Sequence, residues 1–243
     1  MTEPTSGPGG LPTSTRLPRL DRALHPPRLV TWRLLAIVAA VIAVLGLIGG
    51  TWYYASTAPQ RAARVIIAAG GKVRYANDNP ATRVIVAVEL TGPAIRDEHL
   101  AALSPWSYHL PDVTSLDLSG SSITNDALAA LDGAAIRTLR LDRTAITDAG
   151  LAQLVDLPEL ESLSLQHTPV TDAGLANLAR LPRLQMLYLA GSSVTPAGLA
   201  GLATCQPLRY VQLDAAQADA AVLARLKTER PQLGISVRQR VRE

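Results

Sequence analysis

Phenylalanine is absent from this 243-residue chain, and aromatic residues together make up only 4% of it. The hydrophobic fraction is nevertheless 48%, so Leu, Ala, Val and Ile supply most of the apolar surface. Aromatic rings contribute much of the buried area in many protein cores. Their scarcity here favours a core built from stacked layers of aliphatic side chains.

Cysteine is nearly absent too, because Cys205 stands alone. One cysteine excludes an intramolecular disulfide framework and cannot build a thiolate metal site. No histidine lies beside it in the sequence, so we interpret it as a packed thiol near a turn. A catalytic partner that the fold brings close stays an open alternative.

The motifs of common enzymes are also missing. The four histidines form no H-E-x-x-H pair, and no G-x-S-x-G, phosphate-binding or dinucleotide-binding fingerprint occurs. We therefore predict that the chain is not an enzyme and has no catalytic residue, no cofactor and no metal site. A regulatory ectodomain of an enzyme system remains an alternative.

The net charge of +3 comes from the N-terminal part of the chain. Only Glu3 and Asp21 oppose the five arginines there, which are Arg16, Arg19, Arg22, Arg28 and Arg33. The rest of the chain is neutral, so the basic pI does not indicate a nucleic-acid partner. Residues 1–33 are also rich in Pro, Gly, Ser and Thr without an apolar period, which predicts a disordered basic tail.

Residues 34–54 read LLAIVAAVIAVLGLIGGTWYY and carry no charge. As a helix they would extend about 31 Å, which matches the hydrocarbon thickness of a bilayer. Trp32 precedes the run and Trp52 lies at its other end, as interfacial anchors do. The sequence therefore predicts one transmembrane helix.

Two further expectations concern this helix. Cleavage after Ala58 as a signal peptide is the competing interpretation, but Pro59 would follow the cut and the apolar run is too long, so we favour an uncleaved signal-anchor. The excess of arginine before the helix predicts a cytoplasmic N-terminus and a periplasmic or extracellular C-terminal domain. Gly46 and Gly50 have the spacing that permits a homodimer in lipid.

One 24-residue pattern is written three times in succession, over Ile136–Glu159, Leu160–Arg183 and Leu184–Pro207. Its form is L-x-x-L-x-L-x-x-[T/S]-x-[I/V]-T-D-A-G-L-x-x-L, and looser copies extend it to about six units over residues 84–232. A fixed period of this length predicts a solenoid. The paired apolar residues of each unit predict one short strand: Val88/Leu90, Leu116/Leu118, Leu139/Leu141, Leu163/Leu165, Leu187/Leu189 and Val211/Leu213.

A short helix is expected after each strand. Its apolar face begins at Leu100, Leu128, Leu151, Leu175, Leu199 and Leu223, with a second Leu three residues later. Thr124, Thr147, Thr171 and Thr195 stand where an N-cap hydroxyl can accept a backbone N–H. Asp148 and Asp172 follow at the first helical position, where negative charge is favourable, so we interpret them as structural and not catalytic.

These units resemble the leucine-rich repeat, in the T-D-A-G-L variant found in bacterial proteins that include membrane-anchored ones. The resemblance implies an α/β fold, a leucine-rich-repeat solenoid with a curved parallel sheet and short helices on its convex side. It also places Ser121, Thr144, Thr168 and Ser192 at the position of the family's asparagine ladder, where their hydroxyls would satisfy turn amides.

The ends of the array are expected to differ from its middle. Residues 59–83, with a short helix and a strand at Lys72–Tyr75, are predicted to cap the first unit. Residues 233–243 are predicted to form a closing strand and a solvated basic tail. Between the first two units, Ser104–Pro111 carries Trp106 and Tyr108, and we weigh a binding loop against an aromatic plug.

Side chains on the open face of the predicted sheet form two rows. One contains Glu89, Asp117, Arg140, Ser164, Tyr188 and Gln212, and the other contains Ala87, Ser115, Thr138, Ser162, Met186 and Tyr210. Tyr, Met and Arg are enriched in protein interfaces. Arg140, Met186, Tyr188 and Tyr210 are therefore our candidate contact residues.

A solenoid presents an extended concave surface that suits a macromolecular partner. The sequence thus predicts a single-pass, membrane-anchored module that binds a protein or cell-envelope ligand through the concave sheet face. A structural envelope protein without a specific ligand is the alternative.

Overall fold

The computed structural model describes residues 60–77, 84–104 and 110–238. The predicted basic tail 1–33, the predicted membrane span 34–54 and the two aromatic residues of the insertion lie outside these ranges. Within these ranges we find no helix with the length and hydropathy that a bilayer span requires. The tail, the span and their orientation therefore stay predictions.

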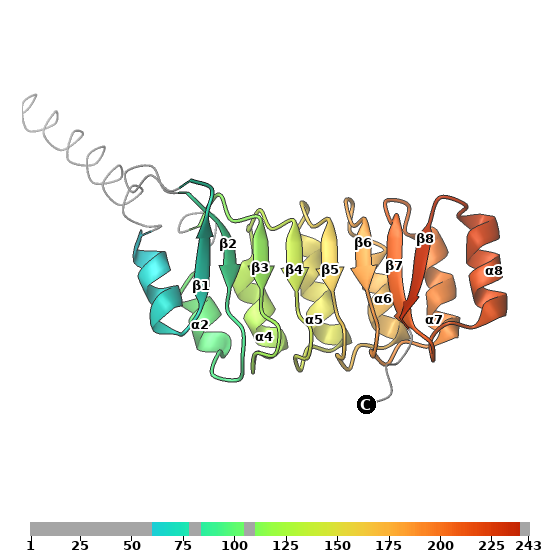
Figure 1. Ribbon diagram of the computed structural model, residues 1–243, viewed down its shortest axis with the longest axis horizontal. Coiled ribbons are helices and arrows are strands. Elements are labelled where there is room, and N and C mark those ends of the chain that lie inside the picture. Colours follow the sequence, from blue (N-terminus) through green and yellow to red (C-terminus); the bar gives the residue numbers. More distant parts are fainter. Residues whose placement is uncertain (1–59, 78–83, 105–109, 239–243) are drawn as a thin grey trace, which may run out of the picture. The chain divides into compact units, whose positions relative to one another are not determined.

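The described residues contain one eight-stranded sheet whose strands follow one another in chain order (Figure 1). β1 is antiparallel to β2, and all later neighbours are parallel. The strands are β1 (Lys72–Tyr75), β2 (Ile85–Glu89), β3 (Ser115–Asp117), β4 (Thr138–Arg140), β5 (Ser162–Ser164), β6 (Met186–Tyr188), β7 (Tyr210–Asp214) and β8 (Gly234–Arg238).

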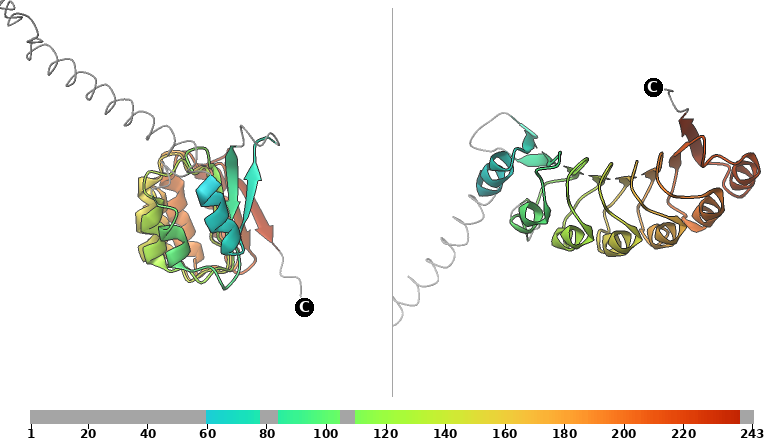
Figure 2. Two further views of the ribbon diagram at one scale, coloured as in Figure 1. Left: turned by 90° about the vertical axis from the view of Figure 1, so that its left-hand side faces the viewer. Right: turned by 90° about the horizontal axis from the view of Figure 1, so that it is seen from below.

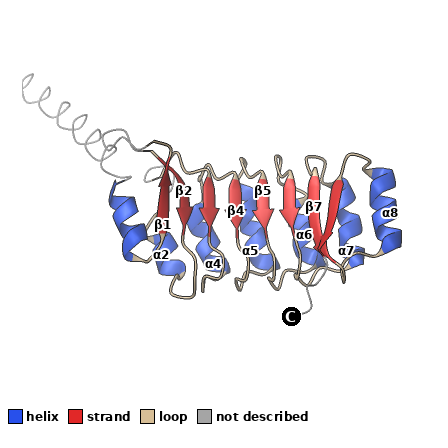
Figure 3. Ribbon diagram, in the orientation of Figure 1, coloured by secondary structure: helices blue, strands red, loops and turns tan. Residues whose placement is uncertain are grey.

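A short helix lies in each crossover between parallel strands, and all of these helices lie on one side of the sheet (Figure 3). Figure 2 shows the sheet on the concave side of the resulting curve and the helices on its convex side. The α-helices are α2 (Asp97–Ala101), α4 (Asn125–Leu128), α5 (Asp148–Gln153), α6 (Asp172–Leu178), α7 (Pro196–Ala200) and α8 (Ala220–Glu229). The 3₁₀ turns η1 (Ala129–Leu131), η2 (Leu154–Asp156) and η3 (Gly201–Thr204) continue three of them.

Aliphatic side chains fill the space between the sheet and the helices, as the repeat predicts. Leu139, Leu163 and Leu187 are 0% exposed on three successive strands. The helix leucines are buried in the same way up to Leu199. Leu223 is only partly buried, because α8 belongs to the last unit and no further helix of the described residues packs against it.

The repeated threonines do lie at helix N-caps, but their expected hydrogen bond is found only at Thr171, which accepts from Ala173 N–H. Their main partner is instead a side chain of the preceding unit, which is Asn125 for Thr147 and an aspartate for the other three threonines. Asp172 accepts the Thr195 hydroxyl at 2.6 Å and the Thr195 amide at 2.7 Å. Asp148 binds Thr171 in the same way, so the Thr-Asp pairs join one unit to the next.

The same contact explains why the fourth residue of T-D-A-G-L is glycine. A Cβ on Gly198 would collide with the side chain of Asp172, and one on Gly174 would collide with Asp148. Each carboxylate therefore occupies the space that a side chain of the next unit would need. The motif carries both partners of a contact between units.

Three of the turn hydroxyls also differ from expectation, because those of Ser121, Thr144 and Thr168 donate to backbone carbonyls. Thr144 Oγ1 donates to Leu141 O at 2.7 Å, and Thr168 Oγ1 donates to Leu165 O at 2.7 Å. In the last unit Gln217 replaces the ladder, and its amide donates to Leu189 O and to the Ser192 hydroxyl. The strand-end carbonyls are thus satisfied by side chains along the array.

Both ends of the sheet carry extra elements. A helix at residues 60–68 and the antiparallel strand β1 lie before the first parallel strand. At the other end, β8 adds one more parallel strand. Arg238, expected in a solvated tail, is the last residue of β8 and donates to Gln166 Oε1 at 3.1 Å.

Candidate functional site

The concave face of the sheet carries the two expected rows of side chains. Parallel pairing aligns Asp117 with Arg140, Arg140 with Ser164 and Ser164 with Tyr188. The second row aligns Ser162 with Met186 and Met186 with Tyr210. The register of the rows is therefore confirmed.

One part of this face is less exposed than expected. Ser164 is 5% exposed and Ser162 is 7% exposed. These short side chains lie between longer ones in the same rows. Contacts with a partner at this point would therefore come from the flanking residues.

Three of the four candidate contact residues come together on β6 and β7. The ring centroids of Tyr188 and Tyr210 are 5.7 Å apart and the ring planes are inclined at 56°. Aromatic pairs favour such a tilted arrangement. Met186 is 39% exposed, and the Tyr188 hydroxyl lies 3.9 Å from its sulfur. We call Met186, Tyr188 and Tyr210 the tyrosine patch.

Arg140, the fourth candidate, lies on β4 and is held by two carboxylates. Its guanidinium lies 3.3 Å from Asp117 and 3.3 Å from Asp142. The Asp142 carboxylate also accepts hydrogen bonds from the Ser164 hydroxyl and, at 2.9 Å, from the backbone N–H of Gln166. The charge of Arg140 is therefore paired with carboxylates of its own sheet. The tyrosine patch lies apart from it.

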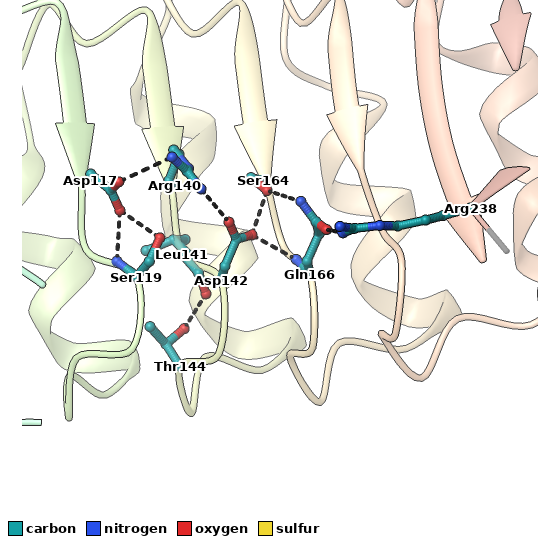
Figure 4. A network of polar contacts seen from close by, with 9 residues as sticks. All are labelled: Asp117, Ser119, Arg140, Leu141, Asp142, Thr144, Ser164, Gln166 and Arg238. Carbon is teal, nitrogen blue, oxygen red and sulfur yellow. Dashed lines mark hydrogen bonds and ion pairs between the residues drawn. The ribbon is translucent and has the colours of Figure 1, made fainter. Parts of the chain in front are cut away.

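This network continues from β4 to the last strand, as Figure 4 shows. The Gln166 side-chain amide donates to Ser164 Oγ at 3.3 Å, and its oxygen accepts from Arg238. The contact joins residues 72 positions apart in the sequence. Sequence periodicity gave no signal for it, because Asp142, Gln166 and Arg238 are not repeated residues.

Two residues with ionisable side chains lie shortly after the ends of β4 and β5 and have an unusual backbone conformation. Arg143 has a φ of 58° and His167 a φ of 55°. The same position in three other units is glycine: Gly92, Gly120 and Gly191. A left-handed conformation costs a residue with a side chain about 1–2 kcal/mol. The alternation of Gly with Arg and His at one repeat position is a sequence signal that could have identified this pair.

Arg143 and His167 line a concavity of about 330 Å³ together with Arg140, Asp142, Gln166 and Arg238. We call this concavity the basic pocket. Its walls come from three consecutive units, the first of which contributes Ser119 and Gly120, and from β8. Ser164 separates it from the tyrosine patch, since Ser164 bonds Gln166 on one side and is paired with Tyr188 on the other.

Groups suited to covalent or metal chemistry are scarce in the described ranges. Within them, no group of three or more His, Cys, Asp or Glu could hold a metal ion. Cys205 is 0% exposed. Burial raises the pKa of its thiol, against the smaller lowering by the Leu208 backbone and by Arg230. A buried and protonated thiol is a poor nucleophile.

Comparison with known proteins identifies the repeats. The sequence model of the leucine-rich-repeat family matches residues 109–131 and 158–179, which contain β3 with α4 and β5 with α6. No curated protein matches the chain. A solved structure similar to it is an internalin from Listeria monocytogenes, with 18% identity and a TM-score of 0.40; the alignment covers 73% of this chain and 62% of that one. The two matched segments are thus leucine-rich repeats by their sequence.

Proposed function

Because the chain carries leucine-rich repeats, we propose that it is a membrane-anchored module that binds a protein partner of the cell envelope through the concave face of its sheet. We assign its repeats to the T-D-A-G-L variant. Leucine-rich-repeat domains generally mediate protein interaction, and a solenoid offers a long concave surface for it.

The tyrosine patch carries this proposal. Two tyrosines and a methionine are grouped on the concave face of an array whose other large apolar side chains are mostly buried. Tyrosine combines a large apolar ring with a polar tip and loses little side-chain entropy on binding. A patch of this composition is typical of the centre of a protein interface.

Membrane anchoring is the second part of the proposal, and its support is the sequence of residues 34–54. The uncharged run has the length of a bilayer-spanning helix, with aromatic residues at its ends. An anchor of this kind would hold the repeat domain near the envelope surface, where its partner would lie.

The test is copurification of partners with the full-length chain from the membrane fraction. The variant is Met186→Ala combined with Tyr188→Ala and Tyr210→Ala, because all three side chains are at least partly exposed. Arg140→Ala is left out, since it would remove the ion pair of the largely buried Asp142.

The matched control is Arg180→Ala combined with Lys227→Ala, which changes exposed side chains in the helical layer. We expect the patch variant to lose a partner, identified by mass spectrometry, that the wild type and the control retain. The purified partner should then bind the wild-type chain directly. Equal recovery by all three chains would refute the proposed face.

A further inference from the structure

The basic pocket holds more positive than negative charge. Arg140 is already paired with Asp117 and Asp142. Among the described residues, neither Arg143 nor Arg238 has a carboxylate within ion-pair distance. Two guanidinium groups therefore face the pocket without a counter-ion from this part of the chain.

A hydrogen bond and a packing contact hold two of the basic side chains of the pocket in place. Arg238 is held in place by its hydrogen bond to Gln166, whose amide in turn donates to Ser164. The His167 ring lies against Gly191, where a Cβ would collide with it. The pocket is thus partly preorganised, which lowers the entropy lost when a ligand binds.

The backbone at Arg143 and His167 is a second and independent observation. Both residues adopt the left-handed conformation that glycine supplies at this position in other units. Strained residues of this kind cluster at functional sites, where a conformation that is unfavourable for folding can preorganise a side chain for binding. Here the two strained residues line the same pocket.

We propose that the basic pocket binds a carboxylate of an acidic peptide segment in the protein partner, with the tyrosine patch taking an apolar residue beside it. This inference rests on the proposed function, since it names the chemistry of that partner. Arginine forks bind carboxylates with two parallel hydrogen bonds. Asp142 also lines the pocket, and its negative charge opposes a doubly charged phosphate more than a singly charged carboxylate.

The substitution Arg143→Gly makes a sharp test, because it restores the residue found in other units and relieves the left-handed strain. The same holds for His167→Gly. Neither change should lower the unfolding temperature, so a loss of binding cannot come from misfolding. Arg180→Gly removes an exposed arginine outside the pocket and serves as the matched control.

The probe is a dye-labelled peptide with one leucine flanked by glutamates, and its counterpart carries glutamines instead of the glutamates. Fluorescence anisotropy is measured with the full-length chain in detergent, at low and at physiological salt. We expect the glutamate peptide to bind, more weakly at higher salt, and the glutamine peptide not to bind. Arg143→Gly should weaken binding about tenfold, the loss of one charge-assisted contact, while Arg180→Gly should not.

Equal binding of the two peptides, or unchanged binding by Arg143→Gly, would overturn the inference. Displacement of the peptide by inorganic phosphate at equal concentration would overturn its choice of a carboxylate. The proposed function is judged separately by the natural partner. If the patch variant loses that partner and Arg143→Gly keeps it, the function stands and the basic pocket is not part of the interface.

Discussion

The side chain of Asp172 reaches out of its own unit and accepts two hydrogen bonds from Thr195 in the next one. Asp148 does the same for Thr171. In the second unit Asn125 takes this place, and because it has an amide as well as an oxygen, it donates to the Thr147 hydroxyl at 2.9 Å and accepts the Thr147 N–H at 3.0 Å. Carboxylate and amide thus fill the same structural position: both accept the threonine N–H, and only the hydrogen bond with the threonine hydroxyl runs in the opposite direction.

The first prediction concerns Gly198→Ala. The new Cβ would collide with Asp172, whose shift would break its bonds to Thr195. We expect the free energy of unfolding to fall by about 1–3 kcal/mol. Urea denaturation followed by circular dichroism measures it.

Gly201→Ala is the control for this prediction. Gly201 is helical, with a φ of −63°, and nothing lies within 4 Å of the position that a Cβ would take there. Alanine at this position should leave stability unchanged or raise it by about 0.4–1 kcal/mol, because it reduces the entropy of the unfolded chain. Equal effects of the two substitutions would show that crowding by Asp172 is not the reason for the glycine.

Among the elements, α8 depends on one residue at its C-terminal end. Arg230 donates to the carbonyls of Cys205 at 2.7 Å, Gln206 at 2.9 Å and Leu208 at 2.9 Å. A fourth, longer bond goes to Ala203. These carbonyls precede β7, so the guanidinium joins the last helix to the preceding turn. The array closes at this end through a polar clamp in addition to packing of Leu226.

The second prediction is that Arg230→Met destabilises the C-terminal end. Its carbonyl partners would lose a charged donor, which should cost about 2 kcal/mol. Amide hydrogen exchange should speed up in α8 and β8 more than in β4 and β5, since each unit of a solenoid depends mainly on its neighbours.

Two further variants separate geometry from charge. Arg230→Lys keeps the charge but not the planar fork, so it should recover only part of the stability. Lys227→Met changes an exposed side chain of the same helix and should have little effect. Uniform acceleration of exchange along the whole array in Arg230→Met would contradict a local role.

At the scale of the whole molecule, the repeat domain has a packed helical face and an open concave face, to which we assign the proposed contacts. The helical layer and the sheet enclose a continuous aliphatic core, and the concave face carries the tyrosine patch and the basic pocket. The predicted segment 34–54 would tie this domain to a membrane.

The third prediction concerns the topology of that anchor. We expect a C-terminal tag on the full-length chain to be accessible to protease added to spheroplasts with an intact cytoplasmic membrane, and an N-terminal tag to be accessible only after lysis. The physical reason is the arginine excess before residue 34. The opposite pattern would refute the orientation, and recovery of the chain in the soluble fraction would refute the anchor.

Sequence periodicity alone was sufficient to predict the repeat, the strand positions and the register of the two surface rows. These follow from periods of two and of 24 residues, which depend on neighbours along the chain and on burial of leucine. Arg140 and the tyrosines could therefore be placed on the right face, in the right order. The same reasoning located the N-caps, because capping is local.

The contacts between side chains of different units could be seen only in the folded domain. The partner of Asp172 is Thr195 in the next unit, Arg140 is held by Asp117 and Asp142, and Arg238 reaches Gln166 across the sheet. Such contacts depend on the rotation between stacked units and on the curvature of the sheet, which no local pattern encodes. Arg143 and His167, which have left-handed backbones, likewise line a pocket only because the fold places them beside β8.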